Sequence, residues 1–143
     1  MAERLDPRLA LAGLDLADEA LRGAVEAAAY GAPRRMRCAT PSAPLTDRPD
    51  AADPLASELL LGELFEVAES RDGWLWGRSA RDGYVGYAPA ACFGPPEPAP
   101  TRRVRALMAH VYPEPSIKSR PVGAAPLGAA LAAEEAADGF HAL

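Results

Sequence analysis

The chain has 143 residues, enough for one average domain or two small ones. Hydrophobic residues make up 49% of it, but 32 of these are alanines, which argues against a single large core. The net charge is −5 and no basic run exceeds two residues, so nucleic-acid binding, which needs clustered cations, is not expected.

Targeting and metal signals are absent from the sequence. The apolar runs fall far short of the ~18 residues that a membrane span needs, and the start of the chain lacks the basic-then-apolar order of a signal peptide. Cys38, Cys92, His110 and His141 have no metal-ligand spacing. We therefore expect a cytoplasmic protein without a membrane partner, metal or other cofactor.

Residues 1–33 are predicted to form an N-terminal helical segment. Asp15 can cap the helix, and Gly31 followed by Pro33 would end it. The positions of one buried stripe are Ala17, Ala20, Leu21, Ala24, Val25 and Ala28. Because most of this stripe is alanine, the helix is expected to pack on the part of the chain after residue 33.

Residues 34–93 change to a pattern of short strands. Met36 and Cys38 alternate with arginines, which predicts a strand. The stretch from Thr40 to Pro54 is rich in Pro and Asp and is expected to be irregular. Three strands over 63–69, 74–78 and 84–87, and a short one at 92–93, complete the series.

Two Asp-Gly pairs, Asp72-Gly73 and Asp82-Gly83, separate the three longer strands. Asp-Gly supplies the positive φ of tight hairpin turns, so two successive hairpins are predicted. A strand, a long loop, three meandering strands and a short closing strand describe a small SH3-like barrel. Residues 94–100, rich in proline, are expected to form a stiff linker.

An internal repeat lies beyond the linker. With an offset of 66 residues, Leu61-Gly62 aligns with Leu127-Gly128, and Asp72-Gly73 with Asp138-Gly139. Residues 101–143 are therefore expected to be a second SH3-like barrel. Leu143 aligns with Gly77, so this barrel would be incomplete, and the simpler explanation is that the chain is cut from a longer protein. The expected fold class is mainly β: an N-terminal helix and tandem small barrels.

The sequence resembles the N-terminal part of NlpC-type cell-wall cysteine peptidases, most closely alphaproteobacterial members. The residues that carry the resemblance are Asp6-Pro7-Arg8, Leu60-Leu61-Gly62-Glu63, Gly73-Trp74, Asp82-Gly83-Tyr84-Val85-Gly86-Tyr87, Thr101-Arg102-Arg103-Val104 and Tyr112-Pro113 with Ile117-Lys118-Ser119. In that family, tandem SH3-like domains precede the peptidase domain. Its members are γ-D-glutamyl-L-diamino-acid endopeptidases that act on peptidoglycan stem peptides.

The catalytic Asp-Cys-Ser-Gly motif of the family is absent here, so no catalytic residue is assigned and this chain is not expected to be an enzyme. The resemblance implies instead that Tyr84 helps a peptidase cleft to recognise the free amino end of a stem peptide. The implied partners are a peptidoglycan-derived peptide and the protein's own peptidase domain.

The candidate binding residues are Tyr84, Asp82, Trp76, Tyr87 and Glu63. Each also has a structural interpretation. Tyr84 could pack across its strand pair, and one of Trp74 and Trp76 could fill the core, with Trp74 favoured for that place. Glu63 could stabilise a turn. Cys38 and Cys92 could form a disulfide, but two buried thiols are favoured in a cytoplasmic setting.

Two functions remain open. The favoured one is a non-catalytic targeting and substrate-positioning module of a peptidoglycan stem-peptide hydrolase. The alternative is a free-standing SH3-like interaction module that binds a peptide or a partner chain through its groove or its open edge.

Overall fold

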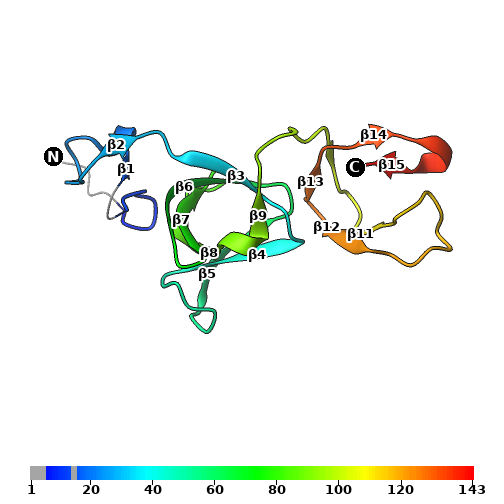
Figure 1. Ribbon diagram of the computed structural model, residues 1–143, viewed down its shortest axis with the longest axis horizontal. Coiled ribbons are helices and arrows are strands. Elements are labelled where there is room, and N and C mark those ends of the chain that lie inside the picture. The colour runs from blue at the N-terminus through cyan, green and yellow to red at the C-terminus, as the bar shows by residue number, and fades with distance from the viewer. Residues whose placement is uncertain (1–5, 14–15) are drawn as a thin grey trace.

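The computed structural model describes residues 6–13 and 16–143 and is mainly β (Figure 1). Its largest element is an antiparallel sheet with the strand order β5-β4-β8-β7-β6-β3-β9. The sheet curls around a core but is open, with β5 and β9 at its edges, so the expected closed barrel is not formed. Its strands are β3 (Arg34–Cys38), β4 (Ser42–Thr46), β5 (Leu55–Leu60), β6 (Leu64–Arg71), β7 (Trp74–Ser79), β8 (Val85–Pro89) and β9 (Phe93–Gly94).

Both predicted hairpins are confirmed. Asp72 and Gly73 join β6 to β7 with φ angles of 50° and 81°, the left-handed pair that a tight hairpin turn requires. Gly83, with φ of 80°, lies in the turn between β7 and β8. These turns set the order of the three central strands.

The prediction of an irregular stretch from Thr40 to Pro54 is wrong in its first part, because this part contains β4. Ala43 and Leu45 are fully buried on one face of that strand. Alanine and proline are both poor strand formers, so the segment Ala43-Pro44-Leu45 conceals the alternation. Burial against the core overrides the local propensity.

The core is built around two stacked phenylalanines. The rings of Phe65 and Phe93 lie 5.0 Å apart, centroid to centroid. Trp74, expected to fill the core, is instead half-buried on the outer face of β7. The buried core consists of Cys38, Ala43, Leu45, Leu59, Phe65, Val67, Leu75, Ala88 and Phe93.

Both cysteines are free thiols. Cys38 is buried in the core, and this burial raises the pKa of its thiol. Cys92 is half-buried, so the expectation of two buried thiols holds for Cys38 alone.

The predicted N-terminal helix is wrong. Residues 16–31 form β1 (Ala17–Asp18), the short 3-10 turn η1 (Glu19–Leu21) and β2 (Tyr30–Gly31), which pairs with β1 in parallel. Gly23 lies in the left-handed region with φ of 85°, which interrupts any helix across the stripe. Six positions with four alanines bury too little surface to overcome that interruption, and of the stripe only Ala17 is buried. The proposed cap, Asp15, lies outside the described residues.

Residues 101–143 form three small antiparallel strand pairs: β10 (Arg102–Arg103) with β13 (Ala130–Leu131), β11 (Met108–Val111) with β12 (Gly123–Pro126), and β14 (Glu134–Glu135) with β15 (His141–Ala142). We refer to them as the second unit and to residues 34–94 as the first unit. A third 3-10 turn, η3 (Ala137–Gly139), joins β14 to β15, and η2 (Ala90–Cys92) precedes β9. Among the described residues, no helix is long and apolar enough to cross a membrane.

The 66-residue repeat is confirmed by strand register. Met108 pairs with Pro126 as Ser42 pairs with Leu60, and the next three pairs of β11 and β12 match those of β4 and β5 in step. In the same way, Arg102↔Leu131 in the second unit corresponds to Met36↔Phe65 in the first. The two units therefore share pairing as well as sequence.

The turns repeat as well. Gly62 and Gly128 have φ angles of 86° and 89°, and their amides donate to the carbonyl oxygens of Cys38 and Val104 at 2.8 and 2.9 Å. Asp138-Gly139 repeats the left-handed pair of Asp72-Gly73. Glycine is retained at these positions because a left-handed backbone strains most residues that have a Cβ, and aspartate is one of the few that tolerate it.

The two units touch at the first of these glycines. The amide of Ala130 donates to the carbonyl oxygen of Leu61 at 2.8 Å. A Cβ on Gly62 would lie 1.7 Å from the carbonyl oxygen of Ala130. The absence of a side chain at Gly62 therefore allows the second unit to pack directly against the first.

Gly62→Ala is expected to be more destabilising than Gly73→Ala. Both residues have positive φ, so both variants carry a conformational cost of about 1–2 kcal/mol. Gly73 has open space around it, whereas alanine at position 62 also collides with Ala130. Urea unfolding of the two variants measures the difference, and equal losses of stability would show that the contact between the units is not formed.

Candidate functional site

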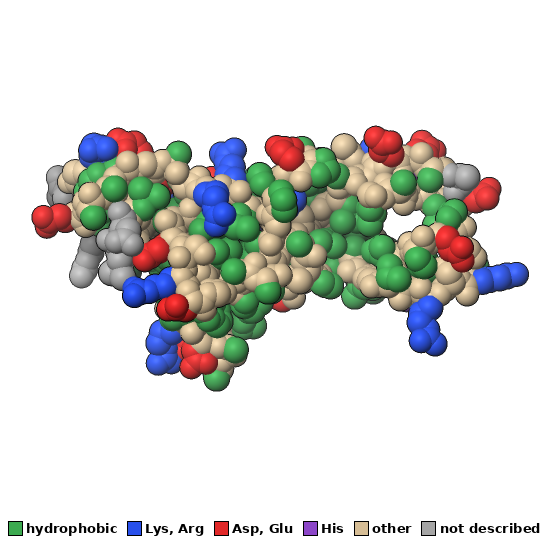
Figure 2. Space-filling view, viewed as in Figure 1, with side chains coloured by type: hydrophobic (Ala, Val, Ile, Leu, Met, Phe, Trp, Pro, Cys, Tyr) green, Lys and Arg blue, Asp and Glu red, His purple; other side chains and the backbone are tan. Residues whose placement is uncertain are grey.

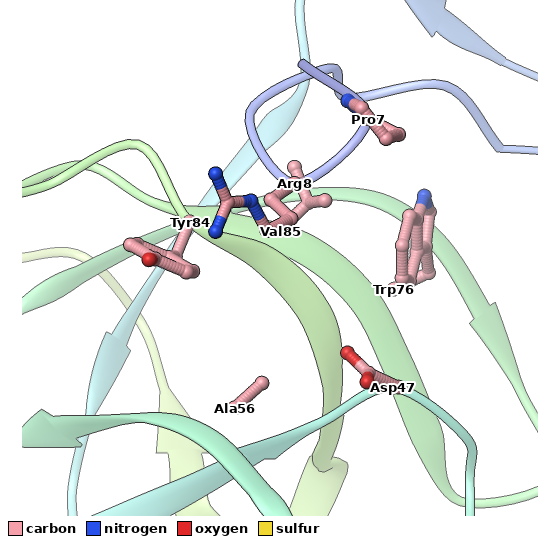
Figure 3. Close-up of a pocket in the computed structure, with 7 residues that line it drawn as sticks. All are labelled: Pro7, Arg8, Asp47, Ala56, Trp76, Tyr84 and Val85. Carbon is pink, nitrogen blue, oxygen red and sulfur yellow. The ribbon is translucent and has the colours of Figure 1, made fainter.

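A groove of about 440 Å³ opens beside β8 on the surface of the first unit. We call it the Tyr84 groove. Figure 3 shows the Arg8 guanidinium next to the Tyr84 ring, with Trp76 at the other end and the Asp47 carboxylate pointing in from the opposite side. Its lining residues are Pro7, Arg8, Asp47, Ala56, Trp76, Tyr84 and Val85.

One wall of the Tyr84 groove comes from the N-terminal segment. The amide of Val85 donates to the carbonyl oxygen of Arg8 at 2.8 Å. The Nε1–H of Trp76 donates to the carbonyl oxygen of Ala12 at 3.1 Å. Both bonds involve backbone carbonyls, so they hold the path of the segment whatever its side chains are.

An ion-pair cluster holds the same segment from the other side. The Nη2 of Arg78 on β7 lies 2.8 Å from Asp18 and 2.6 Å from Glu66. The three side chains are 25%, 13% and 15% exposed, so solvent screens these pairs less than surface pairs. Arg78 therefore ties the N-terminal segment to the central sheet.

The Tyr84 groove carries both signs of charge. Hydrogen bonds from the side chain and backbone of Arg8 lower the pKa of the exposed Asp6 carboxyl to about 2. The same contact raises the pKa of Arg8, which stays cationic. Asp47, across the groove, is exposed. The groove thus offers a cation beside Tyr84 and a carboxylate across from it, with Tyr84 and Trp76 at its two ends.

A second groove of about 380 Å³ lies on the other side of Trp76. We call it the Trp74 groove. The rings of Trp76 and Tyr87 lie 4.7 Å apart with a tilt of 46° and form one of its walls. Its lining residues are Pro49, Glu69, Arg71, Asp72, Trp74, Trp76 and Tyr87.

The strands that carry both grooves fall within one known sequence family. Residues 45–91 match the family model described as the bacterial dipeptidyl-peptidase Sh3 domain. This stretch is a bacterial SH3 domain. A search of curated proteins found no match to the chain. An SH3 domain is a non-catalytic module, and the match agrees with the SH3-like fold expected from the hairpins.

The matched range begins at Leu45 in β4 and ends at Ala91, after β8. It includes Asp47, Trp76 and Tyr84 of the Tyr84 groove. Arg8 lies outside the matched range, so the groove combines the SH3 domain with a segment that precedes it.

The five residues predicted from the sequence are divided among four places, two grooves and two turns. Tyr84 and Trp76 meet in the Tyr84 groove, while Tyr87 joins Trp76 in the Trp74 groove. Asp82 lies in the turn before Tyr84, where its Oδ1 accepts a hydrogen bond from the amide of Tyr84 at 3.2 Å. Glu63 lies in a different turn and lines neither groove.

The contacts of Glu63 are those of a turn-stabilising residue. Its Oε2 accepts from the amide of Leu60 at 3.0 Å, and its Oε1 lies 3.0 Å from Arg81. The side chain is only 9% exposed. These contacts match the structural interpretation considered for this residue, while a binding role stays a prediction.

Two groove residues, Arg8 and Asp47, were missed by sequence reasoning. Asp47 comes directly after β4, and β4 pairs with β8 at Thr46↔Tyr87. Recognising β4 as a strand would have placed Asp47 beside the Tyr84 hairpin. Arg8 belongs to the Asp6-Pro7-Arg8 motif, which the family resemblance marks without giving it a role.

No metal centre is found in the described part of the chain, where no three His, Cys, Asp or Glu side chains are arranged to hold an ion.

Asp18→Asn is expected to loosen the N-terminal segment. Asparagine keeps an oxygen for the hydrogen bond from the amide of Ala20 but loses the charge that faces Arg78. We expect the Val85 amide, which donates to Arg8, to exchange its hydrogen about tenfold faster, since a hydrogen bond to a charged group contributes about 1.5 kcal/mol.

Glu19→Gln is the matched control for this experiment. Glu19 pairs with Arg22, and both side chains are more than half exposed, so the exchange of the Val85 amide should stay unchanged. Equal effects of the two variants would show that Arg78 does not hold the segment.

Proposed function

We propose that this chain is a non-catalytic module that positions a peptide substrate for a bacterial peptidase. The bacterial SH3 domain supports the association with peptidases, because its family is that of the bacterial dipeptidyl-peptidase Sh3 domain. The observation that carries the proposal is the Tyr84 groove, which the Asp47 carboxylate and the Tyr84 side chain both line. Together these two groups suit the ammonium of a peptide's free amino end.

The opposite charge in the Tyr84 groove extends this argument. The Arg8 guanidinium belongs to a side chain that is mostly exposed, and it can pair with a ligand carboxylate. Asp6 forms an ion pair with the same guanidinium. A peptidoglycan stem peptide carries an amino end together with carboxylates. We therefore propose the γ-D-glutamyl-L-diamino-acid type of stem peptide as ligand, and an NlpC-type peptidase domain as the partner that hydrolyses it.

This assignment also proposes a place of action. Stem peptides released from the cell wall are recycled inside the cell, which fits the cytoplasmic location proposed from the sequence.

The Trp74 groove favours a second candidate function, namely binding of an extended peptide as an interaction module. Its aromatic walls suit a proline-rich segment, and the Asp72 carboxylate, whose side chain is 90% exposed, suits a basic residue within it.

The first function is tested by titrating the chain with the tripeptide L-Ala-γ-D-Glu-diamino acid. We expect shifts of the Tyr84 ring and Trp76 indole signals in NMR spectra, and loss of these shifts when the peptide is N-acetylated. Binding should weaken above about pH 8, where an α-amino group loses its proton and its attraction to Asp47.

Two variants locate the ligand. Asp47→Asn should weaken binding about tenfold or more, since it removes the charge opposite the amine. Asp72→Asn makes the same chemical change at the Trp74 groove and should leave binding unchanged. No shift at millimolar tripeptide, or loss of binding in Asp72→Asn alone, would contradict the proposal.

A further inference from the structure

The loop between β4 and β5, residues 47–54, borders both grooves of the first unit. It supplies Asp47 to the Tyr84 groove and Pro49 to the Trp74 groove. The loop projects from the first unit below the label β5 in Figure 1, and Figure 2 shows acidic and basic side chains on this projection. Residues 47–54 are all described, and none of their hydrophobic side chains is buried. Polar contacts, and not core packing, therefore fix the position of Asp47.

The residue that follows Asp47 is held at both of its backbone groups. The amide of Arg48 donates to Oδ2 of Asp53 at 3.0 Å. The carbonyl oxygen of Arg48 accepts from Oγ1 of Thr46 at 2.7 Å and from the amide of Asp50 at 2.8 Å. Thr46 is the buried last residue of β4. Asp47 thus stands between a buried strand residue and a residue whose amide and carbonyl are both bonded.

Asp53 is the centre of these contacts. Its side chain is only 3% exposed, and its Oδ1 accepts from Nε of Arg48 at 2.8 Å and pairs with Nη2 of the same guanidinium. We call this arrangement the Arg48–Asp53 clamp. Hydrogen bonds from the side chain and backbone of Arg48 lower the pKa of the Asp53 carboxyl, which therefore stays ionised at neutral pH. A covered carboxylate that also binds a backbone amide holds its loop more firmly than an exposed ion pair does.

The repeat shows that the hairpin itself does not need the clamp. At the offset of 66 residues, the two clamp residues correspond to Glu114 and Ser119, which cannot form this ion pair. β11 and β12 nevertheless pair in the same register as β4 and β5. The position of Asp47 is taken by Pro113, which has no charge. The clamp and the groove carboxylate are thus present together in one unit and absent together from residues 113–119 of the other.

We propose that Asp53 is a positioning residue of the Tyr84 groove, which holds Asp47 where it meets the ammonium of the ligand. This inference rests on the proposed function, because the ligand is the same peptide amino end. The Arg48–Asp53 clamp orders the loop before the ligand arrives, so that binding does not have to order it. Asp53 itself lines neither groove and acts through its neighbour.

The first measurement needs no ligand. Asp53→Asn removes the charge of the clamp in a side chain of the same size. We expect the backbone amides of Asp47, Arg48 and Asp50 to lose order in NMR relaxation, while the amides of β4 and β5 keep theirs. Asp50→Asn is the matched control, because the exposed Asp50 accepts from the amide of Ala52 at 2.9 Å and an asparagine oxygen can do the same. Equal losses of order in both variants, or none in either, would overturn the proposal.

The second measurement is titration with the tripeptide L-Ala-γ-D-Glu-diamino acid. Asp53→Asn should bind about three- to tenfold more weakly than the unaltered chain, since ordering a mobile loop on binding costs affinity. Asp50→Asn should bind as the unaltered chain does. The double variant with Asp47→Asn should bind within about twofold of Asp47→Asn alone, because Asp53 acts through that carboxylate. A general loss of structure would instead weaken binding in both backgrounds alike.

The outcomes separate this inference from the proposed function. Retained amide signals of β6 and β7 verify the fold of each variant. If the unaltered chain binds the tripeptide and Asp53→Asn binds it equally well, the proposed function stands and the role of Asp53 is overturned. Additive losses in the double variant would overturn that role as well. Absence of binding by the unaltered chain contradicts the proposed function, and this inference then fails with it.

Discussion

The close packing of β8 on β4 is the contact on which the rest of the structure depends. Gly86 allows β8 to lie directly over Leu45, so a single strand closes the core and joins two hairpins into one sheet. The residues on either side of this glycine contact the N-terminal segment or line the two grooves. Val85 bonds to the N-terminal segment, Tyr84 lines one groove, and Tyr87 lines the other.

The N-terminal segment shows how a weakly structured stretch can take part in a site. It has little core of its own, with Leu11 and Ala17 as its buried hydrophobic side chains among the described residues. Two backbone carbonyls and one carboxylate fix it to β7 and β8 instead. These contacts together hold Arg8 beside Tyr84.

Local signals were sufficient for part of this architecture. The Asp-Gly pairs specify their turns by backbone sterics alone. The repeated glycines made the 66-residue offset detectable in the sequence, although most core positions differ between the two units. The helix was misjudged because its regular spacing was given more weight than the small surface of its alanines and the Gly23 that interrupts it. β4 was missed because Ala43 and Pro44 conceal its alternation of buried and exposed residues. The position of Asp47, which follows this strand directly, was therefore missed as well.

The candidate site was predicted to the same limited extent. Tyr84, Trp76 and Tyr87 lie on a hairpin whose turn the sequence reveals, so their shared surface could be expected. Arg8 and Asp47 come from segments far away along the chain, and only tertiary packing brings them there. Glu63 and Asp82 look like binding carboxylates in the sequence, but their hydrogen bonds are local.

Trp76 forms a wall of both grooves. Its indole nitrogen is anchored to Ala12, and its ring leans on Tyr87, so a displacement of this one side chain reshapes both surfaces together. Ligands that move the indole are thermodynamically coupled through it, and the coupling free energy is the same whichever ligand binds first. A ligand that displaces the indole in one groove would therefore also change the wall of the other.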